Sequence, residues 1–343
     1  MKQFISKIQD NNCNNPHLGL FHGKMGICLC YYHIAQKTGD VKYQQMADDL
    51  LDNICENLDT SSTDFENGLA GIGWGIEYLL ENKFVNGDAD EILEEIDIKI
   101  FKALNEGVIY TADVPNGLAG YLFYLISRLK KPFNPDSESQ YICRELLILV
   151  VNKIDELFSK QISTITKVGY FDILWTLPVL IFGLTKVYEL NVYSEKIKLI
   201  VNQWLMYIEE YLPSVHSNRL YLAISLKYIF DRIPSERLRK SIDVLLHSID
   251  YKSLKFETDP ESVRLRDGRY GIIWLLYQAV QLMPESTQSP QYDEFCHTFS
   301  TMKVQFREIL NNDYHSDKEF GLANGIYGIA LMESVNPIIF SND

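Results

Sequence analysis

Side chains that could do acid–base chemistry stand just before a glycine at several places in this sequence. Asp64 and Glu66 precede Gly68, and Asp267 precedes Gly268. Two carboxyl groups that share one site push each other's pKa values apart, so Asp64 and Glu66 could supply one acid and one base. The same side chains could instead cap the helix that begins at the glycine. Both interpretations stay open, and we take Asp64, Glu66 and Asp267 as candidate catalytic residues.

These residues belong to a repeated frame, in which a polar residue is followed by glycine, two further residues, a second glycine and an apolar run. A repeat of this length is typical of a fold built from a series of similar units. The long interval between the third and fourth clear copies leaves room for two degenerate ones, which predicts seven units in all. The clear copies are His22-Gly23-Lys24-Met25-Gly26, Asn67-Gly68-Leu69-Ala70-Gly71, Asn116-Gly117-Leu118-Ala119-Gly120, Asp267-Gly268-Arg269-Tyr270-Gly271 and Asn324-Gly325-Ile326-Tyr327-Gly328, and the degenerate ones are Phe171-Asp172-Ile173-Leu174-Trp175 and Asn218-Arg219-Leu220-Tyr221-Leu222.

Two kinds of helix alternate along the chain. Segments that open at a glycine, such as Gly68 to Leu80 and Gly117 to Leu129, are apolar nearly all round and should be buried between neighbours. The intervening segments carry apolar residues on one face only. Each unit is therefore predicted to pair one buried helix with one amphipathic helix. The amphipathic segments are Val41 to Leu58, Ala89 to Leu104, Tyr141 to Phe158, Tyr193 to Tyr211, Glu236 to Ile249 and Tyr292 to Leu310.

Seven buried helices surrounded by amphipathic ones predict an all-α fold, an α/α toroid of about seven helical hairpins. Strand signals are scarce, and the unbroken repeat favours one domain over residues 1–343. Only six amphipathic helices follow the buried ones, so we expect Lys2 to Asp10 to supply the seventh outer helix.

A ring brings equivalent positions of successive hairpins to one mouth. Polar residues before the first glycines should therefore converge there, beside several helix N-termini that favour an anionic or carbonyl-bearing ligand. We predict that the following residues face one central cavity and bind substrate: His22, Asn67, Asn116, Asp172, Arg266 and Asn324.

Composition excludes some classes of partner. The net charge of −14 disfavours nucleic acid and anionic membranes, and permits a basic peptide. The first ten residues lack the apolar core of a signal peptide, and no stretch approaches the ~18 apolar residues of a membrane helix. The six cysteines at irregular spacing do not look like a disulfide framework. We expect a cytoplasmic protein.

The recurring frame, the block Asn67-Gly68-Leu69-Ala70-Gly71-Ile72-Gly73 and the closing Gly321-Leu322-Ala323-Asn324-Gly325 resemble the lanthionine synthetase C family, the cyclases of ribosomally made peptides. The resemblance covers about Gly19 to Leu331. It implies an α/α barrel and a zinc ion held by a cysteine and a Cys-His pair, which activates a substrate thiol for addition to a dehydrated Ser or Thr. Asp64, four residues before Gly68, matches a functional Asp of the family.

The zinc ligands that the resemblance implies do not match this sequence. The Cys-His-Gly step should fall in the fifth or sixth hairpin, which read Ser217-Asn218-Arg219 and Arg266-Asp267-Gly268. The other zinc cysteine should lie in the fourth or fifth hairpin, where Phe171-Asp172 or Ser217-Asn218 stand, and the family's third-hairpin His is Asn116 here. Zinc prefers thiolate and imidazole ligands, and Arg266 would repel it. We therefore expect no metal and no other cofactor.

Other candidates have a structural alternative. Cys296-His297 falls within an amphipathic segment, and Cys28 and Cys30 fall within an apolar one, where cysteines are commonly buried as small hydrophobes. His22, with His17 nearby, could be a helix cap or a cavity residue. The charged residues around Gly268 could form a structural group of ion pairs or anchor a peptide carboxylate. They are Arg264, Arg266, Asp267 and Arg269.

Two functional hypotheses follow. The first is a lanthionine synthetase C-like protein of peptide modification without the zinc chemistry, which binds a precursor peptide, presents it to another modifying enzyme, or modifies it by a diverged route. The second is a metal-free carbohydrate-active enzyme with paired carboxylates, because α/α toroids also carry glycosidases. Its candidate carboxylates are Asp64, Glu66, Asp172 and Asp267.

Overall fold

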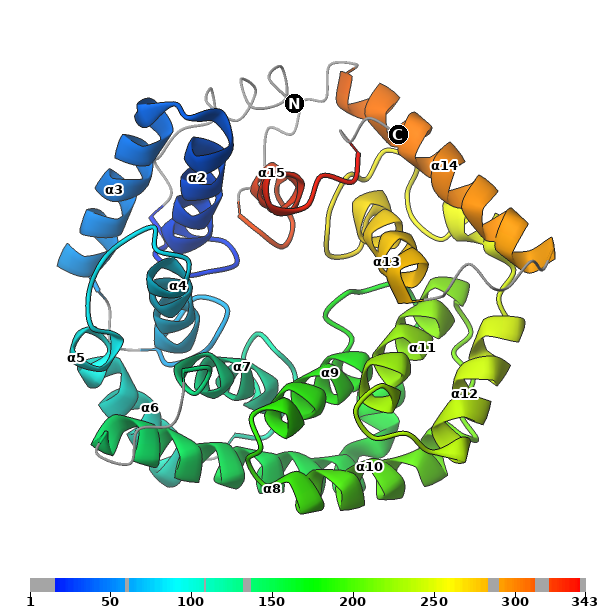
Figure 1. Cartoon of the computed structure of the whole chain (residues 1–343), viewed down its shortest axis with the longest axis horizontal. Helices are drawn as coiled ribbons and strands as arrows, with labels where there is room; N and C mark the ends of the chain where they lie inside the picture. Colours follow the sequence, from blue (N-terminus) through cyan, green and yellow to red (C-terminus); the bar gives the residue numbers. More distant parts are fainter. Residues whose placement is uncertain are drawn as a thin grey trace.

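The computed structural model describes residues 16–58, 62–107, 109–131, 137–282, 290–311 and 321–339. Within these ranges every regular element is a helix and no strand occurs. The helices form a closed ring of two layers, one facing the ring axis and the other on the outside (Figure 1). The predicted all-α toroid is confirmed.

The inner layer contains seven helices among the described residues, as the repeat predicted. From α2 to α13 each inner helix packs beside the next, and the last one, α15, packs against the first, α2. α13 and α15 are joined by the Tyr270 hydroxyl, which donates to Glu333 Oε1 at 2.8 Å. The inner helices are α2 (Lys24–Thr38), α4 (Leu69–Glu81), α7 (Leu118–Arg128), α9 (Thr176–Glu189), α11 (His216–Phe230), α13 (Arg269–Leu282) and α15 (Ile326–Val335).

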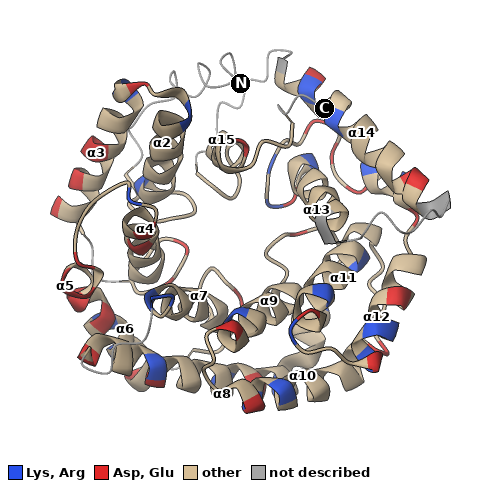
Figure 2. Cartoon of the chain, in the orientation of Figure 1, with Lys and Arg blue, Asp and Glu red and all other residues tan. Residues whose placement is uncertain are grey.

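The outer layer follows the predicted amphipathic segments, and most charged side chains lie on it while the inner helices are largely uncharged (Figure 2). The segment predicted as one helix from Ala89 to Leu104 forms two helices, because the backbone leaves helical geometry at Leu93. The helix expected over Lys2 to Asp10 lies outside the described residues. The outer elements are α3 (Val41–Glu56), α5 (Ala89–Ile92), α6 (Glu94–Glu106), α8 (Glu138–Thr166), α10 (Ser194–Ile208), α12 (Glu236–His247), η1 (Tyr251–Phe256) and α14 (Pro290–Asn311).

Glycines are required where a loop turns back on the start of an inner helix. A Cβ on Gly68 would lie 2.6 Å from the Asp64 nitrogen, and one on Gly71 would lie 2.0 Å from the Phe65 carbonyl oxygen. Side-chain carbons do not approach backbone atoms so closely, so both glycines of the frame are fixed by this tight loop.

The first amide of four inner helices is satisfied by the loop itself. In each case it donates to the carbonyl seven residues earlier, and the N-cap glycine has no side chain that could bind it. The first amide of these helices therefore does not depend on the polar residue before the glycine. The bonds are Lys24 to His17, Leu69 to Ser62, Leu118 to Thr111 and Arg269 to Ser262.

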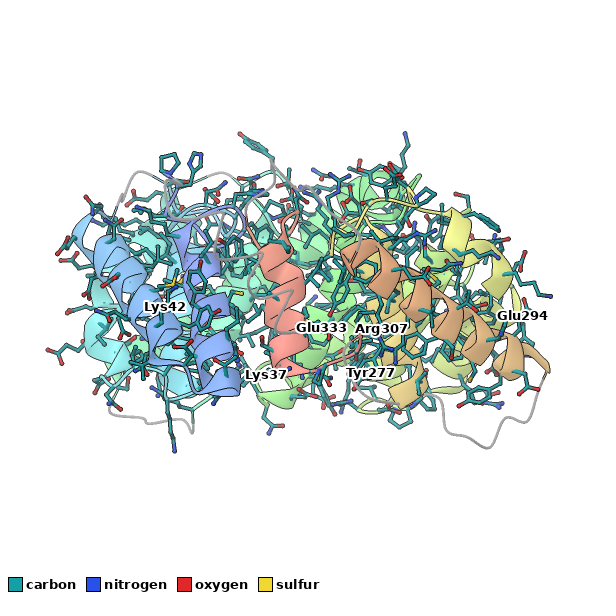
Figure 3. All side chains as sticks on the ribbon, turned by 90° about the horizontal axis from the view of Figure 1, so that it is seen from above. Lys37, Lys42, Tyr277, Glu294, Arg307 and Glu333 are labelled. Atoms are coloured by element: carbon teal, nitrogen blue, oxygen red, sulfur yellow. The ribbon has the colours of Figure 1, made fainter. Side chains whose placement is uncertain are left out.

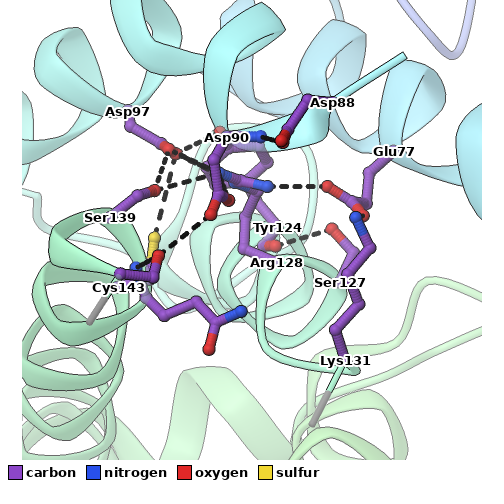
Figure 4. A network of polar contacts seen from close by, with 12 residues as sticks. Glu77, Asp88, Asp90, Asp97, Tyr124, Ser127, Arg128, Lys131, Ser139 and Cys143 are labelled. Atoms are coloured by element: carbon purple, nitrogen blue, oxygen red, sulfur yellow. Dashed lines mark hydrogen bonds and ion pairs between the residues drawn. The ribbon is translucent and has the colours of Figure 1, made fainter. Parts of the chain in front are cut away.

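A buried charged network lies at the other end of the inner helices. Arg128, the last residue of α7, donates to Glu77 at 2.8 Å and contacts Asp90 and Asp97 at 2.9 Å each (Figure 4). The Tyr124 hydroxyl also donates to Asp97. Burial by itself would lower the pKa of Arg128, but the hydrogen bonds to Asp97 and the nearby negative charge together raise it, so the guanidinium stays charged. The network joins α4, α5, α6 and α7, and we name it the Arg128 network.

At this same end of the ring, a side-chain hydrogen bond joins the first hairpin to the last. The Lys37 ammonium at the end of α2 donates to the Glu333 carbonyl of α15. Figure 3 shows both residues where these helices meet. Burial lowers the pKa of Lys37, which opposes its charged form, while the nearby Glu333 carboxylate favours it.

Candidate functional site

The loops before the inner helices are joined edge to edge at one mouth of the ring. The Leu20 and Phe21 amides donate to the Glu66 carbonyl at 3.0 and 2.9 Å. The Phe65 and Glu66 amides in turn share the Pro115 carbonyl, both at 3.0 Å. These bonds tie the first three hairpins together, and they place the loops that carry His22, Glu66 and Asn116 next to one another.

The later hairpins continue the same ring of loops. The Ile173 amide donates to the Arg266 carbonyl at 2.8 Å, and the Arg266 amide donates to Ala323 at 3.1 Å. The Leu322 amide joins the last hairpin to the first by donating to the Phe21 carbonyl at 2.8 Å. The expected convergence of loops that are far apart in sequence is therefore present in the backbone. Whether these residues act on a ligand stays a prediction.

His22 and Glu66 form a contact across the first two hairpins. His22 Nε2 lies 2.9 Å from Glu66 Oε1, with 30% and 19% of the side chains exposed. The contact joins an imidazole nitrogen to a carboxylate oxygen at hydrogen-bonding distance. The pair could hold a polar group of a ligand at the mouth, and it was not among the pairings that the sequence suggested.

Asp172 and Arg266 form an ion pair from the fourth hairpin to the sixth. The Arg266 Nε and Nη2 atoms donate to Asp172 Oδ2 at 3.2 and 3.0 Å. Burial alone would lower the pKa of Arg266, but its bonds to Asp172 outweigh that effect and raise it. Since 30% of the Arg266 side chain is exposed, its guanidinium also keeps an open side.

The charged cluster around Gly268 divides into separate contacts. Arg264 Nε lies 2.9 Å from Asp267 Oδ1, and both side chains are about one third exposed, at 34% and 28%. Arg269, the first residue of α13, is instead 8% exposed and donates to Gln305 of the outer helix α14. Burial lowers the pKa of Arg269. The structural alternative holds for Arg269, whereas Arg264 and Arg266 remain at the mouth.

Asp64 binds groups of its own loop. Its carboxylate accepts from the Asn67 amide at 2.7 Å, from the Gly68 amide at 3.2 Å and from the Ser62 hydroxyl. Asp113 does the same in the third hairpin, where it accepts from the Asn116 amide at 2.9 Å. The spacing of four residues before glycine is common to both, and could have found Asp113.

The amides at the mouth differ in exposure. Asn67 and Asn116 are exposed. Asn324 is half-buried, and its Oδ1 atom is buried without a hydrogen-bond partner among the described residues. A buried acceptor without a partner is uncommon and is costly unless something binds it.

The fifth hairpin does not follow the frame predicted for it. Asn218 lies inside the first turn of α11, fully buried, and its Nδ2 atom donates to the Tyr170 carbonyl at 2.9 Å. The α11 N-terminus is covered by the Glu257 carboxylate, which accepts from the His216 and Ser217 amides at 2.7 and 2.8 Å. Glu257 lies about forty residues away, so no local pattern indicated this cap.

The donors expected for zinc are absent from the matching positions. The fourth, fifth and sixth hairpins place Asp172, Asn218 and Asp267 there, and both carboxylates face a guanidinium. Zinc prefers thiolate and imidazole, so these residues do not fit the ion. Within the described ranges no group of three His, Cys, Asp or Glu side chains is arranged to hold a metal. That the protein binds no zinc stays a prediction.

Cys28, Cys30 and Cys296 lie within helices and not in the loops of the mouth. Cys28 and Cys30 are fully buried in α2, and burial raises the pKa of both thiols and disfavours the thiolate that a metal requires. Cys296 and His297 lie on the outer helix α14, as expected. His17 is exposed beside the first hairpin loop.

The ring of helical hairpins with its polar mouth defines an α/α toroid. Comparison with solved structures gives nisin cyclase, with a TM-score of 0.66, 17% sequence identity, and coverage of 97% of this chain and 92% of that chain. Residues 17–173 match the family model described as lanthionine synthetase C-like protein. The chain is therefore similar to this family over residues 17–173, and to nisin cyclase in its fold. No curated protein sequence matches it.

None of the helices in the described part of the chain combines the length and the apolar character needed to cross a bilayer.

Proposed function

We propose that this chain is a single-domain, peptide-binding protein of ribosomal peptide modification, acting in the cytoplasm without the zinc-dependent thiol addition of its family. The Asp172–Arg266 ion pair carries this proposal. It puts a guanidinium at a position where the family resemblance implies a metal ligand, and it uses the nearest carboxylate to hold that guanidinium. A fixed positive charge opposes a divalent cation there.

The mouth has groups suited to a peptide. Arg264 and Arg266 each keep about one third of the side chain exposed, so they can pair with a carboxylate of the ligand. The His22–Glu66 pair and the exposed Asn67 amide offer both donors and acceptors to a peptide backbone. Asn324 Oδ1, a buried acceptor, would be satisfied by an N–H group of the ligand.

The partner is a precursor peptide. Holding it at the mouth would present it to another modifying enzyme. Asp64, Glu66 and Asp267 stay candidate catalytic residues for a diverged reaction. Asp64 is the weakest of the three because its carboxylate already binds two backbone amides.

The deciding experiment measures zinc and thiol chemistry on the same preparation. The protein is purified without chelators and its zinc content is measured by elemental analysis. It is then mixed with a model peptide that contains one dehydroalanine and one cysteine. We expect far less than one zinc per chain, saturable binding of the peptide by calorimetry, and an unchanged free thiol.

The proposal also predicts that Arg266→Met weakens peptide binding, whereas Arg239→Met on the outer helix α12 does not. Stoichiometric zinc together with loss of the peptide thiol would show that the hairpins were aligned wrongly and that the family reaction is retained. Failure of the peptide to bind at any accessible concentration would remove the peptide-binding role.

The carbohydrate hypothesis gains no specific support. Each of its four candidate carboxylates already has a partner. Asp64 accepts from backbone amides, Glu66 contacts a histidine, and Asp172 and Asp267 each pair with an arginine.

A further inference from the structure

An apolar groove with an acidic rim lies in the outer wall of the ring, between α6 and the start of α8. It encloses about 330 Å³. Its apolar part is formed by Ile98 and Phe101 of α6 and by Ile142 of α8. Ile98 and Phe101 are 47% and 45% exposed, and they line the same groove as Ile142. This groove is remote from the mouth.

The rim of the groove is negatively charged. Glu94 and Glu138 are both exposed there, and neither forms an ion pair among the described residues. Glu94, Ile98 and Phe101 follow the helical spacing of four and three residues, so they form one stripe along α6. The carboxylate and the apolar side chains are thereby presented together to whatever enters.

The carboxylates at the base of the groove already have hydrogen-bond partners. Asp97 accepts from the Ser139 hydroxyl at 2.9 Å and from Arg128, and Asp90 accepts from the Ser137 hydroxyl at 2.9 Å. Asp90 and Asp97 also belong to the Arg128 network, and the Ser139 bond connects α6 to the start of α8 (Figure 4). The charge that the rim adds is not neutralised by that network.

We propose that this groove is a second docking site, which takes a basic, amphipathic segment of the peptide partner. A lysine or arginine side chain would lie with its methylene stem on Ile98 and Phe101 and its charged head between Glu94 and Glu138. Phe101 adds a ring face for the cation. The groove volume is at the lower end of the range of ligand pockets, roughly 300 to 1,000 Å³, which suits one or two side chains.

This inference rests on the proposed peptide-binding function, and it adds a contact that the mouth does not supply. A peptide held at the mouth and at the outer wall would gain affinity from the second contact through its raised effective concentration. The two sites can be tested separately because they share no residue.

The test uses three fluorescein-labelled octapeptides with blocked ends: alternating leucine and lysine, alternating serine and lysine, and alternating leucine and glutamate. Binding to the full chain is followed by fluorescence anisotropy at about 0.15 M salt, where long-range attraction to the acidic surface is screened. We expect saturable binding of the leucine–lysine peptide only.

Matched variants locate the binding. Glu94→Lys with Glu138→Lys should weaken binding at least about tenfold, because like charges now meet the probe. Glu195→Lys with Glu210→Lys on the α10 side changes the net charge equally and should alter affinity less than about twofold. Phe101→Ser should also weaken binding. Circular dichroism and thermal melting of each variant check that the fold is kept.

Three results would overturn the proposal: equal loss in the α10 control, equal binding of the serine–lysine peptide, or no binding of the leucine–lysine peptide to the unchanged protein. Arg266→Met separates the two sites. It should leave the affinity for the leucine–lysine probe unchanged, and a loss there would place the probe at the mouth instead.

Discussion

The two ends of the ring hold charged side chains in different ways. At the mouth, Arg266 keeps 30% of its side chain exposed beside a single carboxylate. At the opposite end, Arg128 is only 2% exposed and binds three carboxylates. A half-exposed pair can exchange its partner for a ligand at little cost, whereas a buried charge cannot lose its partners without a large penalty. The comparison assigns recognition to the mouth and stability to the Arg128 network.

The largest effect is expected from Arg128→Met. This change leaves the buried Asp97 carboxylate without its cation and Glu77 with only the Lys131 ammonium at 3.7 Å, and should lower the free energy of unfolding by about 3–5 kcal/mol. Denaturant unfolding followed by circular dichroism measures the loss. A change as small as that of Arg266→Met would show that the two ends are energetically alike.

The pH dependence of stability gives a second test of the end of the ring opposite the mouth. Burial lowers the pKa of His33 to about 4, while its Nε2 atom stays hydrogen-bonded to the Tyr78 hydroxyl at 2.8 Å. The unfolded chain, with a histidine pKa near 6.5, binds the proton first as pH falls. Stability is therefore full above about pH 6.5 and declines toward pH 4, by on the order of 1–3 kcal/mol from this group.

The measurement compares the unfolding free energy of the natural protein and His33→Gln between pH 4 and pH 8. The variant should show a shallower decline, because glutamine does not titrate. Parallel curves for the two proteins would mean that His33 is not buried in its neutral form.

Arg266→Met should have a smaller effect on stability, of about 1 kcal/mol, because 30% of the Arg266 side chain is already exposed to water. Its effect on binding of a peptide carboxylate should be larger than its effect on unfolding. Calorimetric titration and denaturant unfolding of the same variant measure both. Asp172→Asn serves as the control, since it breaks the ion pair and leaves the guanidinium available. A stability loss near that of Arg128→Met would assign Arg266 to structure.

The smallest effect is expected for Glu66→Gln, at most about 0.5 kcal/mol, because the His22–Glu66 contact is partly exposed. Glutamine keeps a hydrogen-bond acceptor for His22. Thermal melting at pH 7 measures the change, with Glu195→Gln on α10 as a reference for an exposed surface carboxylate. A loss of several degrees would mean that Glu66 supports the loop rather than a ligand.

The candidate site was only partly predictable. A ring carries equivalent positions to the same height, so the sequence predicts that residues before the glycines meet at the mouth. The backbone bonds of Glu66 with Phe21 and Pro115, and those of Arg266 with Ile173 and Ala323, follow that geometry. The pairing of side chains was not predictable, since Asp172 and Arg266 are 94 residues apart. The repeat predicts Asn218 in the loop before a helix, but α11 begins at His216, so Asn218 lies in its first turn.

The sequence by itself determined the local rules of this protein. Gly68 and Gly71 permit the tight loop, and the alternation of apolar and amphipathic segments separates inner helices from outer ones, because each depends on neighbours within a few residues. Only the tertiary structure decided which charges are buried together. The Arg128 network and the groove beside it require α4, α6, α7 and α8 to meet, and the energy of a charge depends on the water and partners that surround it in space.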